Sequence, residues 1–221
     1  MLCNSCRAAL EWLDPQECCR RCGAPLEPRR LSAGLCAYCR ERPPAYAQAV
    51  AALRYSGPLT SAIPLWKYAS ERSLSPVFSS LLIDWVAAKA PKWWESVDGI
   101  VPVPHHPRTV RGRGFCPPED LAGALARAFR IPYLPRALFK VRFTRPQTGL
   151  GRAARVANLD GSMFVFDRSL VEGGTLVVVD DVMTTGATLN ECTRALGVAG
   201  AKKVYGLVLA RQSEGDGLGG G

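Results

Sequence analysis

The chain has 221 residues, of which 48% are hydrophobic, so it is long enough for one ordinary α/β domain plus a small appendage and needs no disulfides to fold. No window approaches the roughly 18 uninterrupted apolar residues of a membrane span, and the amino terminus lacks a basic segment followed by an apolar core. These features exclude an integral membrane protein and a secreted domain stapled by disulfides, and we expect a soluble, cytoplasmic protein.

The formal net charge of +9 is concentrated in one central segment. Residues 101–159 carry eleven Lys and Arg residues against Glu119 and Asp120, while the rest of the chain balances at seventeen against seventeen. A basic field of this kind attracts phosphates, on a small ligand or on a nucleic acid. A solvated, arginine-rich surface without a ligand is the alternative.

Seven of the nine cysteines lie before residue 40, and six of these form three C-x-x-C pairs. The pairs are Cys3 with Cys6, Cys19 with Cys22, and Cys36 with Cys39. Two such pairs can hold one tetrahedral zinc ion in a closed structural site. We expect the second and third pairs to form that site and the first to be a half site, with Cys18 as an alternative ligand. A zinc-binding domain over residues 1–43 follows, because Pro43 and Pro44 end this region.

After residue 44 the hydrophobic pattern predicts alternating strands and helices up to residue 213, followed by a disordered tail at 214–221. Strands or extended segments are expected at 48–55, 99–104, 131–135, 163–166, 174–181 and 202–211. Helices are expected at 57–68, 74–90, 118–129 and 188–200. Continuous apolar strands that alternate with helices indicate an α/β fold with a parallel sheet flanked by helices.

The stretch "LVVVDDVMTTGATL" places Asp180 and Asp181 at the end of a predicted buried strand, where parallel α/β sheets bind ligands. A loop from Val182 to Thr188 then opens the next helix. Small residues, threonine hydroxyls and the positive end of the helix dipole favour a phosphate there. The acids would repel that phosphate, so we expect them to face sugar hydroxyls or a magnesium ion.

The segment "VVVDDVMTTGAT" closely resembles the phosphoribosyl pyrophosphate signature of type I phosphoribosyltransferases. The resemblance implies that the paired acids hold the ribose hydroxyls and the threonine loop the 5′-phosphate. Three further features, "VPVPHHPRTVRGRGF", "RFTRPQTGLGRAARVANLDGSMF" and the C-x-x-C pairs, extend it over residues 3–212 to the ComF (ComFC) family. That family is associated with DNA uptake in natural transformation. It implies a type I phosphoribosyltransferase-like sheet with a small amino-terminal zinc ribbon.

Two departures from the family pattern stand out. The family continues R-G-F with asparagine, whereas this chain has Cys116 at that place, which puts a polar contact there in doubt. Many members also carry another C-x-x-C pair ahead of the first one found here. A shortened amino terminus would account for that difference and for the half site.

The resemblance also implies roles for individual residues. Backbone amides after "GIVPVP" form a pyrophosphate loop, with Arg108, Arg111 and Arg113 as candidates to bind the leaving group or a second substrate. The stretch from Arg142 to Asn158 suits a lid, with Arg142, Gln147 and Arg155 as its candidate side chains. The catalytic residues assigned are Asp180, Asp181 and Arg155. The ligand-binding residues assigned are Lys67, Val103, Pro104, His105, Arg113, Asp180, Asp181, Val182, Thr184, Thr185, Gly186, Ala187 and Thr188.

Two functions follow as hypotheses. The first is a phosphoribosyltransferase-like protein that binds phosphoribosyl pyrophosphate with magnesium, transfers pentosyl groups to an unidentified acceptor, and contains structural zinc. The second is a competence factor that binds single-stranded DNA beside the competence helicase machinery, or a ligand sensor, with little or no transferase activity. The oligomeric state is not predicted.

Overall fold

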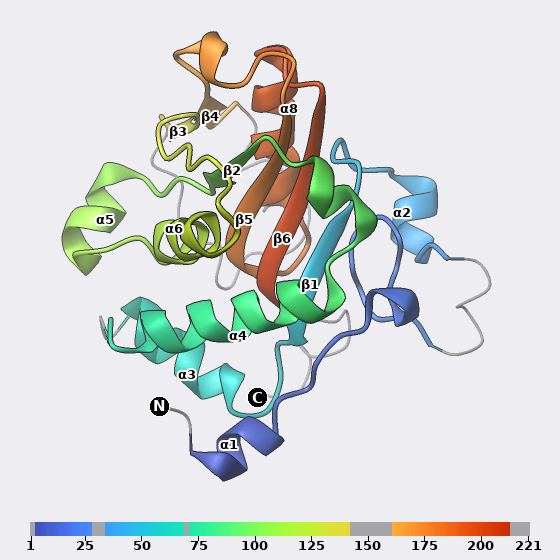
Figure 1. Cartoon of the computed structure of the whole chain (residues 1–221), viewed down its shortest axis with the longest axis vertical. Coiled ribbons are helices and arrows are strands. Elements are labelled where there is room, and N and C mark those ends of the chain that lie inside the picture. The colour runs from blue at the N-terminus through green and yellow to red at the C-terminus, as the bar shows by residue number, and fades with distance from the viewer. Residues whose placement is uncertain (1–2, 28–33, 69–70, 142–160, 213–221) are drawn as a thin grey trace.

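The computed structural model describes residues 3–27, 34–68, 71–141 and 161–212. Its centre is a four-stranded parallel sheet with the strand order β1-β6-β5-β2 (Figure 1). These strands are β1 (Ala49–Arg54), β2 (Gly99–Pro102), β5 (Thr175–Met183) and β6 (Lys203–Arg211). The predicted parallel sheet is therefore confirmed, and each of its strands lies where the hydrophobic pattern predicts one.

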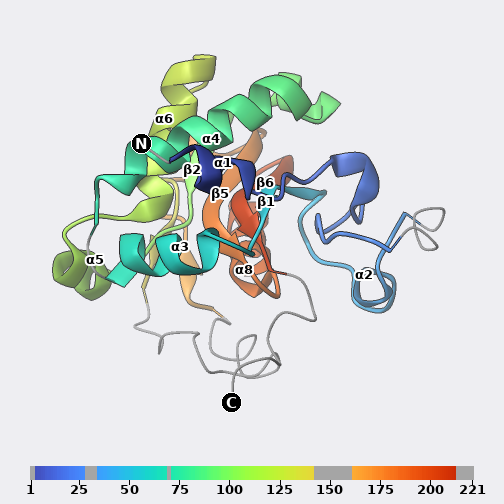
Figure 2. The same cartoon turned by 90° about the horizontal axis from the view of Figure 1, so that it is seen from below.

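Helices cover both faces of this sheet. One face packs against α3 (Leu59–Tyr68), α4 (Leu74–Lys89) and α6 (Pro117–Phe129), and the other against α8 (Ala187–Val198). Figure 2 shows α4 and α6 on one side of the strands and α8 on the other. Val177 and Val179 of β5 belong to the first core and Val178 to the second, because side chains alternate along a strand. Strands buried on both faces explain the uninterrupted apolar runs.

The cysteine-rich segment contacts both cores: Leu10, just after its first helix, packs in the first core, and Cys19, Cys22 and Cys39 pack in the second, on the α8 side of the sheet. It contains α1 (Asn4–Ala8), the 3-10 turn η1 (Pro15–Glu17) and α2 (Ala37–Glu41). Cys19, Cys22 and Cys39 are buried in the same hydrophobic cluster as Val178 of β5 and Leu189 of α8. The cysteines therefore lie against the second core, while the division of the chain at residue 43 stays a prediction.

Short elements complete the described part of the chain. They are η3 (Lys92–Ser96), α5 (Pro107–Arg113), the antiparallel pair β3 (Phe139–Lys140) and β4 (Met163–Phe164), and η4 (Arg168–Leu170). No pattern in the sequence predicted α5. The extended stretch at 131–135 contributes a single bridge, between Tyr133 and Ile100. The expected lid and the tail at 214–221 fall outside the described residues.

Among the described residues, no helix combines the length and apolar character that crossing a membrane requires.

Candidate functional site

Asp180 and Asp181 occupy the carboxyl end of β5. Because side chains alternate along a strand, Asp181 points to the face covered by α3 and Asp180 to the face covered by α8. Asp181 is 2% exposed, and its Oδ1 accepts hydrogen bonds from Lys67 Nζ at 2.5 Å and from the Val182 N–H at 2.6 Å. Asp180 Oδ1 accepts the N–H of Asp181 at 2.9 Å. The two predicted acids thus have different partners at one strand end.

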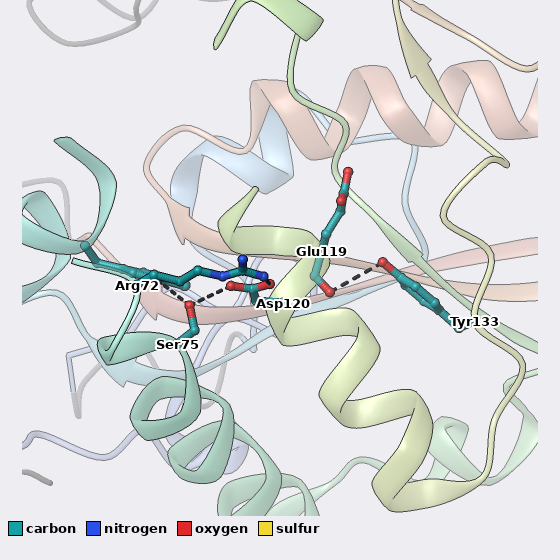
Figure 3. A network of polar contacts seen from close by, with 6 residues as sticks. Arg72, Ser75, Glu119, Asp120 and Tyr133 are labelled. Carbon is teal, nitrogen blue, oxygen red and sulfur yellow. Dashed lines mark hydrogen bonds and ion pairs between the residues drawn. The ribbon is translucent and has the colours of Figure 1, made fainter. Parts of the chain in front are cut away.

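Lys67 comes from the carboxyl end of α3, and a polar network holds that end in place. The neighbouring Trp66 is fully buried, and its indole N–H donates to Ser75 Oγ at 2.8 Å. Ser75 in turn donates to Asp120 Oδ2 at 2.6 Å, and Arg72 pairs with Asp120 Oδ1 at 3.4 Å (Figure 3). This chain of contacts ties α3 to the start of α6, and so positions Lys67 against Asp181.

The charges at this strand end shift one another's protonation. Burial lowers the pKa of Lys67, but the nearby Asp181 and Asp180 outweigh burial and leave that pKa raised, so Lys67 is a cation at neutral pH. Burial and the charge of Asp181 raise the pKa of Asp180 to about 7. A ligand that donates hydrogen bonds or carries a cation would therefore favour the ionised form of Asp180.

Three buried polar atoms around the acids have no hydrogen-bond partner among the described residues. They are Asp181 Oδ2, His105 Nδ1 and Arg113 Nη1. Buried polar groups without partners are rare in proteins because each loses its hydration without compensation. All three residues belong to the site predicted from the sequence: Arg113 Nη1 can donate to an anionic group of a ligand, and Asp181 Oδ2 can accept from a hydroxyl or bind a cation.

His105 follows β2 and stands close to the acids. Burial, together with the positive charges of Arg113, Lys67 and Lys140, lowers its pKa to about 4 against the opposing effect of Asp181. The imidazole is therefore neutral at pH 7 and offers one donor and one acceptor nitrogen.

The predicted phosphate loop is shorter than expected. β5 continues through Met183 and α8 begins at Ala187, so only residues 184–186 connect them. Val182 is a paired strand residue opposite Ala210, and Thr188 lies in the first turn of α8. The expected loop from 182 to 188 is wrong at both ends, because strand pairing with β6 and the helix each extend further than the local pattern indicates.

Gly186 shapes the turn between β5 and α8. Its φ of 78° lies in the left-handed region, and an added Cβ would stand 2.6 Å from Met183 Cε. Thr185 Oγ1 accepts the Ala187 N–H at 3.3 Å, which caps the first turn of α8. Thr184, Thr185 and Ala187 are half-buried. Thr184 and Thr185 thus lie directly before the amino terminus of α8, where the helix dipole favours an anion.

The predicted pyrophosphate loop lies beside the acids. The Val103 N–H donates to the Val179 carbonyl at 2.9 Å, which aligns the chain after β2 with the end of β5. Pro104 and His105 follow before α5 begins at Pro107. Of the three candidate arginines of α5, Arg108 and Arg111 are exposed. Arg113 is half-buried and its guanidinium lies 5.6 Å from the ring centroid of Tyr68, at the end of α3.

Lys140 is a site residue that the sequence reasoning missed. It is half-buried on β3, where burial lowers its pKa, while Cys192 and Asp180 raise it. Its charge also acts on His105, so it belongs to the same electrostatic group. No local signal could have identified it, because only the folding of β3 and β4 brings it there. The predicted lid residues Arg142, Gln147 and Arg155 lie outside the described residues.

The donors at this site suit a magnesium ion that arrives with its ligand. Magnesium prefers oxygen ligands and is commonly held by one or two carboxylates together with substrate phosphates. Asp181 Oδ2 has no partner among the described residues and Asp180 is partly accessible. Lys67 already forms an ion pair with Asp181, so the two acids alone would bind magnesium weakly. Phosphate oxygens of the ligand would have to complete the coordination.

A second group of side chains has the geometry of a metal site. The ligand sulfurs of Cys19, Cys22, Cys36 and Cys39 all lie within 4.8 Å of one another. The Sγ atoms of Cys22 and Cys36 are 3.8 Å apart, which fits two thiolates on one tetrahedral zinc ion with Zn–S bonds of about 2.3 Å. Gly23 follows with a φ of 67°, and a Cβ there would stand 2.8 Å from the Ala49 carbonyl oxygen. The predicted four-cysteine set is thus brought together and can hold zinc.

Cys3 and Cys6 are not in this group. Cys3 is exposed at the start of α1, and both Figure 1 and Figure 2 show α1 well away from α2. Cys18 is buried but also lies outside the group, so Cys19 is the residue that joins it.

The comparisons with known proteins agree with these features. The family described as "Phosphoribosyl transferase domain" matches residues 119–218. "DNA utilization protein YhgH" of Escherichia coli (strain K12) is 29% identical over 212 residues, covering 95% of this chain and 90% of that protein. "Competence protein F" of Haemophilus influenzae is 29% identical over 213 residues, with the same coverage.

Solved structures give a weaker likeness. A glutamine phosphoribosylpyrophosphate amidotransferase from B. subtilis, complexed with ADP and GMP, aligns with a TM-score of 0.40 and 23% identity. The alignment covers 62% of this chain and 26% of that one.

The sequence relatives confirm the resemblance to the ComF family that the motifs indicated. The chain is therefore similar to phosphoribosyl transferase domains over residues 119–218, carries a four-cysteine cluster ahead of that region, and resembles competence protein F and the DNA utilization proteins along nearly its whole length.

Proposed function

We propose that this protein binds phosphoribosyl pyrophosphate with magnesium at the carboxyl end of β5 and transfers its phosphoribosyl group to an acceptor. The observation that carries the proposal is the pair Asp180 and Asp181 beside the short turn at the start of α8. Asp181 Oδ2 has no partner among the described residues. One ligand with a ribose, a phosphate and a pyrophosphate would satisfy all of these groups.

Each part of the ligand has a matching partner. Asp180 and Asp181 accept hydrogen bonds from ribose hydroxyls, and the ion pair with Lys67 keeps Asp181 oriented. The turn at Thr184 and Thr185 receives the 5′-phosphate at the positive end of α8.

The leaving group needs positive charge as it departs. Arg113 Nη1 and the neutral His105 face this region with unused hydrogen-bonding capacity among the described residues. Bound magnesium would supply the remaining neutralisation of the developing pyrophosphate charge. Lys140 adds a further cation on the Asp180 side.

Titration calorimetry with phosphoribosyl pyrophosphate, with and without magnesium, tests the binding proposal. We expect heat from the wild type that an Asp180→Asn/Asp181→Asn double variant loses, with affinity reduced at least tenfold. The matched control is Asp84→Asn, since Asp84 is half-exposed on α4 and pairs only loosely with Arg7 at 3.8 Å. No heat with the wild type, or equal heat with the double variant, would refute the proposal.

Turnover is tested separately by following pyrophosphate release in the presence of candidate acceptors. Release that depends on an acceptor and on Asp180 supports a transferase. Tight binding with no release under any acceptor supports a ligand sensor instead.

A second function, binding of single-stranded DNA, is favoured by one specific observation. Phe139, Phe164 and Phe166 are 36%, 52% and 66% exposed, and the ring of Phe166 contacts the other two edge to face, with ring centroids about 5 Å apart. Exposed aromatic rings beside basic residues are where bases of single strands stack. The names of the relatives, with "DNA utilization" and "Competence", point to the same role, and a competence helicase is the partner we propose. The cytoplasmic location remains a prediction.

Fluorescence anisotropy with a labelled oligonucleotide tests this role. We expect affinity to fall steeply with salt and to drop by about thirtyfold or more in a Phe164→Ala/Phe166→Ala variant, because each stacked base contributes about 1–3 kcal/mol. The control is Trp12→Ala, an aromatic residue exposed to 44% in the amino-terminal segment. Equal losses in both variants would argue against a stacking surface at these phenylalanines.

A further inference from the structure

We infer that the four-cysteine cluster and the turn between β5 and α8 form one coupled unit, in which Arg211 is the positioning residue. Metal in the cluster holds Arg211, and Arg211 holds the turn in its binding-competent conformation. The coupling concerns the shape of the turn itself, while its effect on phosphoribosyl pyrophosphate rests on the function proposed above.

Arg211 is the last residue of β6 and is only 3% exposed. Its Nη1 donates to the Met183 carbonyl at 3.0 Å and also to the carbonyl of Thr184. Met183 ends β5 and Thr184 begins the turn. One guanidinium nitrogen therefore fixes the backbone at the point where the chain leaves the sheet for the phosphate site.

The other edge of the same guanidinium faces the cysteine cluster. Arg211 Nε donates to the Cys22 carbonyl at 3.3 Å, and Nη2 lies 4.0 Å from Cys22 Sγ. Cys22 belongs to the four-sulfur group. Because a guanidinium is rigid and planar, a displacement at the cysteine edge is transmitted to the carbonyl edge.

The charge of Arg211 gives the cluster a further role. Within the part of the chain that the structure describes, no carboxylate pairs with Arg211. A buried cation without a counter-charge is strongly unfavourable. Four thiolates around one Zn²⁺ leave a net negative charge next to Cys22, and this charge is the natural partner of the guanidinium.

A second contact joins the same two regions. Tyr46 is 2% exposed and lies in the hydrophobic cluster that contains Cys19, Cys22 and Cys39. An added Cβ on Gly186 would stand 3.0 Å from Tyr46 Oη, so the phenol packs directly against the turn. The preceding Ala45 N–H donates to Asn190 Oδ1 of α8 at 2.6 Å. The segment after the cysteines therefore contacts both the turn and the first part of α8.

Amide hydrogen exchange of residues 184–190 tests the coupling without any ligand. The proteins are the zinc-loaded and chelator-stripped wild type, Arg211→Met, Arg211→Lys and Arg54→Met. Arg54 is the matched control because it lies directly opposite Arg211 on the neighbouring strand β1, while its Nε pairs with Glu11 Oε2 at 3.0 Å. Zinc content is measured for every protein.

We expect zinc removal to speed exchange at 184–190 on the order of tenfold, a typical size for coupling between two sites. Arg211→Met should exchange equally fast with zinc still bound, and Arg211→Lys, which keeps the charge but not the planar fork, should be intermediate. Arg54→Met should match the wild type, and exchange in α4 should stay unchanged throughout. Unchanged exchange in zinc-loaded Arg211→Met, or faster exchange spread evenly over α4 as well, would overturn the inference.

Zinc transfer to a chromophoric chelator provides the reciprocal measurement, because coupling between two sites acts equally in both directions. With phosphoribosyl pyrophosphate and magnesium present, less zinc should pass from the wild type to the chelator at equilibrium. In Arg211→Met the amount of zinc transferred should not change. If the zinc-loaded wild type does not bind phosphoribosyl pyrophosphate at all, the proposed function fails, and the exchange measurement still decides on the coupling. If stripped protein unfolds, the zinc-loaded variants alone decide it.

Discussion

Replacement of Lys67 tests whether the ion pair at the end of β5 stabilises the fold as well as the site. Lys67 Nζ lies 2.5 Å from Asp181 Oδ1, and the two side chains are 19% and 4% exposed. Removing one member of a buried pair leaves an uncompensated charge and costs about 3–5 kcal/mol. Because Lys67 keeps some contact with solvent, we expect Lys67→Met to lower the free energy of unfolding by about 3 kcal/mol, at the low end of that range.

The pair of Lys89 and Asp14 is a matched control. Its atoms are 2.7 Å apart, but the side chains are 52% and 33% exposed, and exposed ion pairs contribute about 0–1 kcal/mol. Urea unfolding at pH 7 of Lys67→Met, Lys89→Met, Asp181→Asn and the Lys67→Met/Asp181→Asn double variant completes a double-mutant cycle. Equal losses for the two lysine variants, or a cycle that is additive within about 0.5 kcal/mol, would refute the reasoning.

The pH dependence of this contribution has a defined sign. The pKa of Lys67 is raised above its ordinary value of 10.5, so the folded state holds the proton more tightly than the unfolded state. The stabilisation is fully present below pH 10.5 and is lost as the pH rises through the folded pKa. Measurements at pH 7 therefore report the whole effect.

Four further predictions concern single features. The raised pKa of Asp180 means that the folded state binds its proton more tightly between pH 4 and 7, so stability should fall as pH rises through that window, and Asp180→Asn should flatten the profile in urea melts. Gly186→Ala should lower the free energy of unfolding by about 1–2 kcal/mol, measured in the same melts, because its φ of 78° is unfavourable for a residue with a Cβ. His105, whose pKa is lowered to about 4, should show a neutral imidazole by NMR at pH 6, and a charged one would contradict its burial. Cys22→Ser should abolish zinc binding in a metal assay and lower Tm, whereas Cys3→Ser should leave both unchanged.

Much of the fold follows from local patterns. The sequence predicts β5 and β6 from their uninterrupted apolar runs and α4 from apolar residues at a helical spacing. These patterns reflect burial, because a strand covered on both faces is apolar throughout and a helix buries one face. The spacing of Cys19, Cys22, Cys36 and Cys39 likewise identifies a metal-binding set before any tertiary contact is known. The motif at Asp180 marks the end of the strand at which we propose that the ligand binds.

The exact ends of the strands and helices could not be predicted from the sequence. Val182 belongs to β5 because its partner Ala210 on β6 extends the pairing, and Ala187 starts α8 because Gly186 adopts a left-handed turn that the loop pattern did not specify. The ends of β5 and α8 depend on pairing with a neighbouring strand and on backbone geometry. The spacing of apolar residues along the chain carries no information about either.

The sequence by itself determined the order of strands and helices, the metal-ligand spacing and the acids at the end of β5, because each depends on residues close together in the chain. Tertiary structure alone decided which distant groups meet. Lys67 and Asp181 are 114 positions apart, and Arg211 lies 189 positions from Cys22. Contacts at such separations depend on strand register and helix packing, which the whole fold sets at once, and they connect Asp181 with α3 and the turn after β5 with the cysteine cluster.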